Sequence, residues 1–453
     1  MFRADSAARS PVWGVTSALG EPVSSIRAAL PSTPMDNAGA ALVSWAESGA
    51  MALTGPAHGA PSAAPAAVAT AAAVAADALR LESARWGRAV AVDGPGLLGE
   101  RAAIGGLTRG GSTSVGGAAR FFAASDGWVV LNLPRPEDAA ALPALVSADV
   151  AADDWPSIER GLRSLTCEEL VDQATLLGLA VAAAHPGTTS RSHSRKLASG
   201  GPRIITSTPL VVDLSSLWAG PLAAQLIGAA GARVIKVEGR DRPDGARRGS
   251  SAFFDLLNHE KECLQVDFRN RDEIALLQRL IGAADLVIEG SRPRVMDALG
   301  IDPAAVAAAG TNWLSITAHG RTGDAAQRVG FGDDAAVAGG LFVPGAPPMF
   351  VADAVADPLT GLVAAGRGAA LLGQDRAAVI EVALARVSSW ASGPSDSTAA
   401  ASDIDGWYVE VDGERLPVAA PHHRPVPAAA PAPGAQTASI VAEFVDETSR
   451  SPG

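Results

Sequence analysis

Lysine and cysteine are nearly missing from this chain of 453 residues, and it contains no long, strongly hydrophobic run. The lysines are Lys196, Lys236 and Lys261, and the cysteines are Cys167 and Cys263. Two isolated cysteines give neither a disulfide framework nor the spacing of a metal site. The N-terminus lacks the apolar core of a signal peptide, and no stretch has the length and hydrophobicity of a membrane span. We therefore expect a cytoplasmic protein without a bound metal.

Positive charge is also scarce, because 36 Lys and Arg face 48 Asp and Glu and give a net charge of 36 − 48 = −12. This excess of acid argues against broad binding to nucleic acid or to an anionic membrane surface. It leaves room for a local basic pocket that binds a phosphorylated small molecule. The dinucleotide fingerprint G-x-G-x-x-G does not follow Leu214, which disfavours an NAD or FAD enzyme.

The segment 211–238, VVDLSSLWAGPLAAQLIGAAGARVIKVE, predicts a strand, a tight turn, a helix and a second strand. Leu210–Leu214 has the length of a buried strand. Pro221 suits the start of a helix, Gly231 suits its exit, and Val234–Val237 is the next strand. Such a unit implies a right-handed parallel crossover, although by itself it fits any α/β protein. The helix N-terminus then faces a cleft in which an anionic ligand can bind.

Strands and helices continue to alternate after this unit. Further strands are expected at Leu264–Phe268, Asp285–Glu289 and Trp313–Ala318. Helices are expected at Asp272–Ala283 and Pro293–Leu299. This pattern predicts an α/β protein whose large domain is a doubly wound, Rossmann-like parallel sheet.

The first half of the chain predicts a smaller α+β domain, with a hairpin turn at Asp126-Gly127 and helical periodicity from Trp155 to Leu179. Residues 48–61 also echo residues 339–348, and each copy precedes a small-residue helix and a β-like segment, at 89–93 and 378–382. We therefore expect five parts: a degenerate partial repeat of the large domain (1–110), the small α+β domain (111–184), a linker (185–209), the Rossmann-like catalytic domain (210–387), and a Pro/Ala-rich tail that packs back on it (388–453).

Ordered motifs between Val211 and Leu372 resemble the family III CoA-transferases, which include formyl-CoA transferase, carnitine CoA-transferase and the α-methylacyl-CoA racemases. The opening crossover, LLNHEKECLQVDF (256–268), DLVIEGSRPRVMDALG (285–300), the Gly-rich stretch 316–341 and VADPLTGLVAAGRGAALL (355–372) match the family's motifs in order. The small domain precedes the large one here, whereas in the family it follows. The order indicates rearranged or fused halves. The family's interlocked dimers imply either a homodimer or a monomer that supplies both halves.

The resemblance implies transfer of CoA between an acyl-CoA and a small carboxylic acid through a covalent aspartyl intermediate. CoA and acyl-CoA would be substrates, with no permanently bound cofactor. Asp357 occupies the position of the nucleophile, with Asp353 as the fallback, although Asp357 before Pro358 also fits a helix N-cap. Thr70 holds the corresponding position in the first-half echo, which therefore looks inert. The alternatives are an acyl-CoA racemase or isomerase, disfavoured because Gly332-Asp333 replaces the racemase histidine, and a non-catalytic CoA-binding homologue.

The resemblance also implies which residues contact CoA. Glu262 follows Lys261, where the family has a basic residue, and this departure weakens the case for phosphate binding there. Arg240 and Arg242 are further cations next to the second strand of the crossover. The residues expected to bind CoA are Trp218, Ala219, Asn258, Lys261, Arg292, His319 and Arg328.

Overall fold

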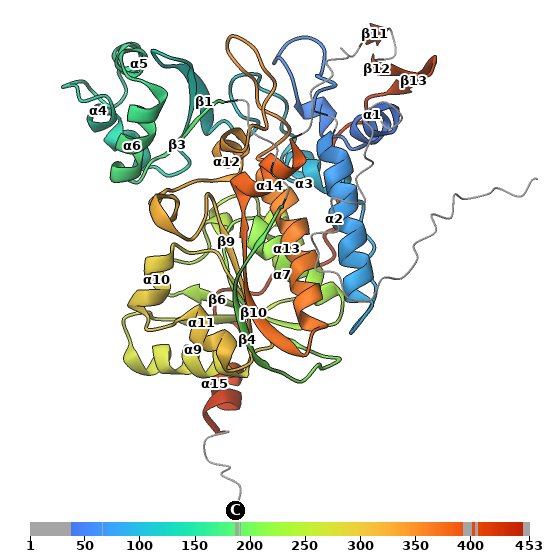
Figure 1. The fold of residues 1–453 in the computed structure, drawn as a ribbon, viewed down its shortest axis with the longest axis vertical. Coiled ribbons are helices and arrows are strands. Elements are labelled where there is room, and N and C mark those ends of the chain that lie inside the picture. The colour runs from blue at the N-terminus through green and yellow to red at the C-terminus, as the bar shows by residue number, and fades with distance from the viewer. Residues whose placement is uncertain are drawn as a thin grey trace, which may run out of the picture.

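The computed structural model describes residues 38–65, 67–185, 190, 192–392, 401–403 and 406–446. Its large domain is built on a seven-stranded sheet, and a smaller α+β module lies at one end of it (Figure 1). The first 37 residues of the predicted partial repeat fall outside the described residues. No helix within the described ranges is both long enough and apolar enough to cross a lipid bilayer.

The seven-stranded sheet confirms the predicted fold class. Six strands run parallel, and β4 pairs antiparallel with β10 at one edge. Numbered in chain order from β5, the parallel strands lie in the order 3-2-1-4-5-6, which is the doubly wound arrangement. Across the sheet the strands are β4 (Arg195–Pro202), β10 (Arg376–Ala383), β9 (Asn312–Thr317), β8 (Leu286–Glu289), β5 (Leu210–Leu214), β6 (Arg233–Gly239) and β7 (Glu262–Val266).

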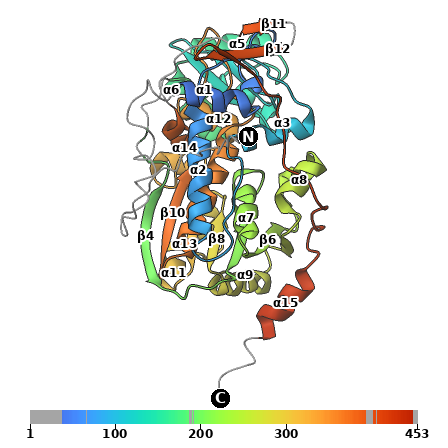
Figure 2. The same ribbon diagram turned by 90° about the vertical axis from the view of Figure 1, so that its right-hand side faces the viewer.

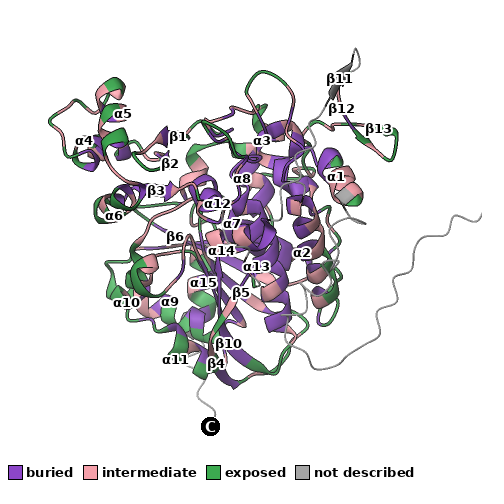
Figure 3. Cartoon of the chain, turned by 45° about the horizontal axis from the view of Figure 1, so that its top comes forward, coloured by how far each residue is buried: buried purple, intermediate pink, exposed green. Residues whose placement is uncertain are grey.

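Helices cover both faces of this sheet because successive strand residues point to opposite sides. Val211 and Ile288 belong to the apolar core on one face, and Val212 and Val287 belong to the core on the other. Figure 3 shows the buried residues concentrated on the sheet and on helices such as α7 and α13. The first face carries α2 (Ala67–Ser83), α7 (Ala219–Ala229) and α13 (Ala356–Leu372), and the second carries α9 (Arg271–Ala283), α11 (Pro303–Ala308) and α15 (Thr437–Asp446).

Helices α2 and α13 lie against each other and join the two halves of the chain in one core (Figure 1). Each has 17 residues, and small side chains such as Ala75 let the helices approach closely at Gly366. The predicted strand at 89–93 does not form: Arg88 instead donates a backbone hydrogen bond to Ala230 at 2.8 Å, and no ladder follows. The duplication itself remains a prediction.

The small module has a three-stranded antiparallel sheet of β1 (Ala119–Ala123), β2 (Trp128–Asn132) and β3 (Ala180–Ala183). The predicted hairpin turn at Asp126-Gly127 is confirmed, since it joins β1 to β2. Helix α6 (Cys167–Leu177) begins with a capping box and ends at Gly178, which has a φ of 69°. Apolar residues of β1, β2 and β3 pack against α12 (Gly332–Ala338) of the large domain.

The segment 185–209 is not only a linker, because residues 195–202 form the edge strand β4. Its Gly200-Gly201 pair indicated a loop, but a Cβ at either position would collide with a backbone carbonyl oxygen of α11. The tail packs back on the large domain through α15, which contacts α9 and β7 (Figure 2). The remaining elements are α1 (Ala38–Glu47), α3 (Glu100–Gly105), α4 (Leu142–Leu145), α5 (Trp155–Ser164), α8 (Ser251–Asn258), α10 (Pro293–Ala298), α14 (Leu384–Ala391), β11 (Ala401–Asp403), β12 (Gly406–Val411) and β13 (Glu414–Pro417).

Candidate functional site

A cavity of about 960 Å³ opens at the carboxyl ends of the parallel strands. We call it the central cavity. Most of its lining residues belong to the loops after β5, β6, β8 and β9 and lie within 216–218, 241–250, 290–295 and 317–333, although not every residue of these ranges lines the cavity. Because β5 and β8 are the neighbours at which the strand order reverses, this is the crevice in which doubly wound folds bind ligands.

Asp357 lies in the wall of the central cavity and is partly exposed. The expectation that it caps α13 is wrong, because the helix begins at Ala356 and Val355 is the N-cap. Asp357 therefore occupies the first turn, where the helix dipole still favours negative charge. Its backbone amide donates to the Ala354 carbonyl at 2.8 Å, and a hydrogen bond from the Gly332 amide favours the carboxylate form.

Gly332, the first residue of α12, leaves the space in which the Asp357 carboxylate lies. A Cβ at position 332 would collide with Asp357 Oδ2 and would lie 2.5 Å from the Ala354 carbonyl oxygen. Both neighbours are held by the start of α13, so neither can move without moving that helix turn. Position 332 therefore requires glycine, because the Asp357 carboxylate and the Ala354 carbonyl lie too close for any side chain.

Gly332→Ala is expected to lower turnover about 100-fold, because a displaced nucleophile loses its alignment with the substrate. Gly282→Ala is the matched control: it lies within α9, and its Cβ would meet nothing within 4 Å. The control should keep full activity and gain about 0.5–1 kcal/mol of stability. Steady-state kinetics and thermal unfolding measure both variants, and equal activity in the two would contradict the role of Gly332.

Three more carboxylates surround Asp357. Asp333 and Asp334 lie in the first turn of α12, and Asp353 precedes α13. Arg101 of α3 pairs with Asp353 through two hydrogen bonds, of 2.8 Å from Nε and 2.5 Å from Nη2. Asp353 is fully buried and held by this ion pair, so it is not available to attack a substrate. Of the two candidate nucleophiles, only Asp357 faces the central cavity.

Burial among one another raises the pKa values of three of these four aspartates. Burial raises the pKa of Asp357 to about 7; Arg101 opposes this effect, and Asp334 and Asp353 add to it. Burial also raises the pKa of Asp333 to about 7 and that of Asp334 to about 6. Raised carboxyl pKa values in a cleft are typical of functional sites.

The raised pKa of Asp357 predicts that activity increases with pH. The reactive form is the carboxylate, whose population grows as the pH passes through about 7, so kcat/KM should rise between pH 6 and pH 8. Asp334→Asn removes a negative charge that raises this pKa, so it should move the midpoint to lower pH. A flat profile from pH 5 to 8, or a midpoint that moves upward in the variant, would contradict this assignment.

Arginines dominate the charge of the central cavity although the chain as a whole is acidic. The guanidinium groups of Arg242, Arg248 and Arg292 form no ion pair or hydrogen bond with any residue that the structure describes. Arg328 donates to the Val181 carbonyl at 3.1 Å and has no carboxylate partner among those residues. Arg240 pairs with Glu273 and does not line the cavity. Unpaired guanidinium groups in a cleft favour an anionic ligand, above all a phosphate.

Trp218 lines the central cavity as the N-cap of α7, and only 2% of its surface is exposed. The Arg101 guanidinium carbon lies 5.0 Å from the centre of its ring, and Phe253 packs edge-on against it with ring centres 5.0 Å apart. Ala219 is the first residue of α7; it is buried and does not line the cavity.

Besides Ala219, three further predicted CoA-binding residues do not line the central cavity. Lys261 is buried and pairs with Asp213 at 2.8 Å, so its charge is already neutralised inside the protein. Asn258 is buried at the end of α8, where its Nδ2 donates to the Phe254 carbonyl. His319 lies behind Gly330, and burial lowers its pKa to about 3, with Arg328 adding to the effect. Their positions outside the cavity favour structural roles, because a buried ion pair and a CoA-binding lysine give the same local sequence pattern.

The sequence motifs did not point to Arg101 or Asn132. Asn132, at the end of β2, lines the central cavity, and its Nδ2 donates to Asp334 Oδ1 at 2.7 Å. The small module thus reaches the cleft of its own chain through Asn132, while Asp126 accepts from the Cys167 amide at 2.8 Å. Both missed residues lie in the first half of the chain and meet their partners more than 200 residues away. No local motif signals such a contact.

The comparisons with known proteins place this site in a family context. Residues 209–423 match the sequence model of CoA-transferase family III. The chain is 29% identical over 168 residues to the succinyl-CoA–D-citramalate CoA-transferase of Chloroflexus aurantiacus, covering 34% of this chain and 42% of that protein. It is 31% identical over 190 residues to the probable fatty acyl-CoA transferase Rv3272 of Mycobacterium tuberculosis, covering 38% and 48%. These matches confirm the resemblance inferred from the motifs.

Similarity to solved structures is partial. The crystal structure of Rv3272 has a TM-score of 0.37 and 29% sequence identity to this chain, and the match covers 44% of this chain and 56% of that one. The matches span less than half the length of either of these two curated relatives.

Proposed function

Since residues 209–423 match CoA-transferase family III, we propose that this protein transfers CoA from an acyl-CoA to a carboxylic acid, with Asp357 as the nucleophile. One observation carries the proposal: a partly exposed carboxylate with a raised pKa lies in a cavity whose free cations are arginines. A thioester that carries phosphates fits both features, because the carboxylate can attack its carbonyl while the arginines bind its phosphates.

Different loops of the cavity are suited to bind different parts of an acyl-CoA. Arg242 and Arg248 follow β6, and Arg292 follows β8; all three can bind a pyrophosphate group. Trp218 lines the same cavity as Asp357, and its apolar ring suits the acyl or pantetheine portion. Arg101 stays paired with Asp353, which leaves the Asp357 carboxylate free to react.

The reaction then proceeds through intermediates on Asp357. Its carboxylate attacks the thioester carbonyl, the C–S bond breaks, and CoA thiolate leaves an aspartyl–acyl anhydride. The thiolate attacks the aspartyl carbonyl and expels the first acid as a carboxylate, giving an aspartyl-CoA thioester. The acceptor carboxylate repeats these steps in reverse and regenerates Asp357 with a new acyl-CoA. No net proton or electron is consumed.

The chain contributes both the large domain and the small module to the site. Asn132 and Arg135 of the small module line the same cavity as Asp357. We infer that the site is complete without a small module borrowed from a partner chain, whether the protein is a monomer or a homodimer. This arrangement is what the rearranged order of the two halves makes possible.

An exchange assay tests the proposal. The protein is incubated with succinyl-CoA and a panel of short carboxylic acids, and the thioesters are separated chromatographically. We expect a new acyl-CoA to form with ping-pong kinetics, since the enzyme holds CoA between two half-reactions. Binding of CoA by calorimetry without exchange for any donor and acceptor would overturn the proposal and favour a non-catalytic CoA-binding protein.

A further inference from the structure

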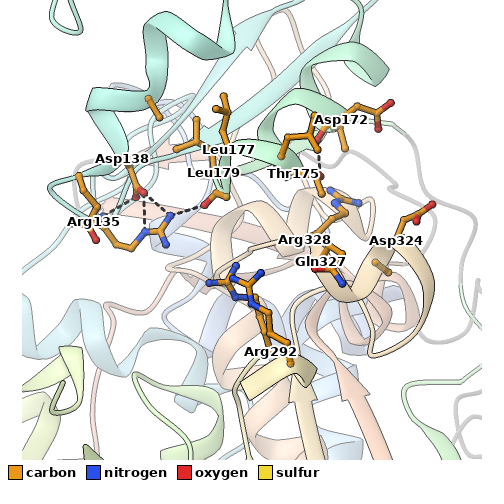
Figure 4. Close-up of a pocket in the computed structure, with 17 residues that line it drawn as sticks. Arg135, Asp138, Asp172, Thr175, Leu177, Leu179, Arg292, Asp324, Gln327 and Arg328 are labelled. Carbon is orange, nitrogen blue, oxygen red and sulfur yellow. Dashed lines mark hydrogen bonds and ion pairs between the residues drawn. The ribbon is translucent and has the colours of Figure 1, made fainter. Parts of the chain in front are cut away.

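A second cavity, of about 1000 Å³, lies between the small module and the large domain, and Figure 4 shows Arg135 paired with Asp138 in its wall. The charge of its lining is balanced, because it contains four arginines and four carboxylates. The lining of the central cavity contains six arginines and three aspartates. The preference for an anion therefore belongs to the central cavity, where the unpaired Arg242 and Arg248 lie on the loop after β6.

The loop after β6, residues 241–250, directs two of its side chains away from the central cavity. All of its residues line that cavity except Asp244 and Arg247. Both side chains contact charged residues of β6 instead. These are Lys236 and Glu238, which are buried and, being two residues apart, lie on the same face of the sheet. The loop is therefore held to its own strand at two points.

Two ion pairs form these contacts. Lys236 Nζ lies 2.8 Å from Asp244 Oδ2, and Arg247 Nη2 lies 2.6 Å from Glu238 Oε2. Lys236 Nζ also donates to the Ser215 carbonyl, in the turn after β5, at 3.0 Å. Buried ion pairs often stabilise a fold no better than apolar side chains would, and in some proteins they fix one conformation instead. The structure here offers a conformation for them to fix.

Asp244 holds a second segment of the cavity wall besides its own loop. Its Oδ1 accepts a hydrogen bond from the Leu217 amide at 3.0 Å and another from the Ala246 amide at 2.9 Å. Leu217 belongs to the turn after β5, next to Trp218, and lines the cavity. Its φ is 71°, a backbone conformation that is unfavourable for a residue other than glycine and persists only where the surroundings hold it.

The side chains of the turn and the loop are also in contact. A Cβ at Gly245 would lie 3.3 Å from Leu217 Cδ2 and 3.8 Å from Arg248 Nη2. Leu217 therefore rests against the loop beside the Arg248 guanidinium group. A shift of the turn would move this leucine, and a shift of the loop would move this arginine, so the two segments must be placed together.

We propose that Asp244 is a positioning residue for CoA binding, whose two carboxylate oxygens set the turn after β5 and the loop after β6 before the ligand enters. The inference rests on the proposed function, in which Arg242 and Arg248 bind the phosphates of CoA. Loops that are already ordered lower the cost of binding, so loss of the Asp244 hydrogen bonds weakens CoA binding. The reaction at Asp357 is unaffected, because Asp244 does not line the cavity.

Two double variants separate the hydrogen bonds of Asp244 from its ion pair. Lys236→Met with Asp244→Asn keeps an oxygen that can accept from both loop amides, whereas Lys236→Met with Asp244→Leu keeps none. Both variants remove the two charges of the pair together. Calorimetry measures CoA binding, and steady-state kinetics measures KM and kcat for an acyl-CoA.

We expect the Asp244→Leu double variant to weaken CoA binding and to raise the KM for acyl-CoA, each about 10-fold, with kcat within about two-fold of wild type. The Asp244→Asn double variant should stay within about three-fold of wild type in all three quantities, because the amides keep their acceptor.

Arg203→Met with Asp285→Leu is the matched control. Arg203 Nη2 lies 2.8 Å from Asp285 Oδ1, and Asp285 Oδ2 accepts from the Leu210 amide at 2.9 Å, so this carboxylate also joins a buried cation to a backbone amide. It lies at the amino ends of β5 and β8, whereas the cavity lies at their carboxyl ends. The control should keep the CoA affinity of the wild type, whatever it loses in thermal stability.

Hydrogen exchange on the wild-type protein tests the same role without a substitution. The amides of Leu217 and Ala246 should be protected before CoA is added. Protection that appears only with CoA would overturn the proposal, and so would equal CoA binding by the two Lys236→Met double variants. A wild-type protein that binds no CoA would remove it together with the proposed function. If CoA binds and the Asp244→Leu double variant weakens it while no exchange of CoA between acids occurs, Asp244 keeps its role and the transferase fails.

Discussion

Asp357→Asn is expected to abolish CoA exchange, with a loss of about 1000-fold or more. The asparagine has nearly the same shape, so Gly332 and the first turn of α13 need not move. It lacks the anionic oxygen that attacks the thioester, so no anhydride can form. The exchange assay measures the loss, and calorimetry with CoA should show that binding is retained.

Asp77→Asn serves as the matched control, because Asp77 is exposed on α2 and does not line the central cavity. Its exchange rate should stay within about two-fold of wild type, as expected for a surface substitution. Asp353→Asn separates the two candidate nucleophiles, since it removes the Asp353 carboxylate while its amide oxygen can still accept a hydrogen bond from Arg101. A folded Asp353→Asn protein without exchange, beside an active Asp357→Asn protein, would contradict the assignment.

Arg101→Met is expected to lower the free energy of unfolding by about 3–5 kcal/mol. The Asp353 side chain is fully buried, and Arg101 is its only hydrogen-bond partner within the described residues. Removing the arginine leaves a buried carboxylate without compensation. The same change removes the guanidinium stacked on Trp218, which adds about 0.5–1 kcal/mol. Urea denaturation at pH 7 measures the effect.

The double variant Arg101→Met with Asp353→Leu should recover most of this stability, because no unpaired charge stays buried. Arg80→Ala is the surface control: its pair with Asp77 is solvent-exposed and should contribute less than about 1 kcal/mol. If Arg101→Met costs no more than Arg80→Ala, the buried pair does not hold the start of α13 in place.

The succession of strands and helices in the large domain could be predicted, because each is indicated by a local sequence pattern. Short apolar runs such as 210–214 and 286–289 became buried parallel strands, and the intervening periodic segments became helices that cover both faces. The edge strand β4 was missed since its Gly200-Gly201 pair and polar residues indicate a loop. It is a strand because it pairs with β10, and a glycine there admits the backbone of α11. That requirement comes from packing, which the local sequence does not show.

In the candidate site too, local motifs indicated some residues, while others depend on contacts between distant parts of the chain. Motifs along 211–372 pointed to Asp357, Trp218, Arg292 and Arg328, and all four line the central cavity. The motif around Lys261 also indicated CoA binding. In the structure the Lys261 ammonium group forms a buried ion pair with Asp213, and the local sequence does not distinguish these two roles. The role of Arg101 could not be recognised from the local sequence, since its partner Asp353 lies 252 residues further along the chain.

Locating the covalent intermediate tests the central claim most directly. Wild-type protein is incubated with an acyl-CoA, digested with trypsin and analysed by tandem mass spectrometry. Residues 329–367 form one tryptic peptide that contains Asp333, Asp334, Asp353 and Asp357, so fragmentation within it must assign the modified residue. We expect the mass of CoA, joined as a thioester, on Asp357. A CoA adduct on Asp353 or on any other peptide would contradict Asp357 as the nucleophile.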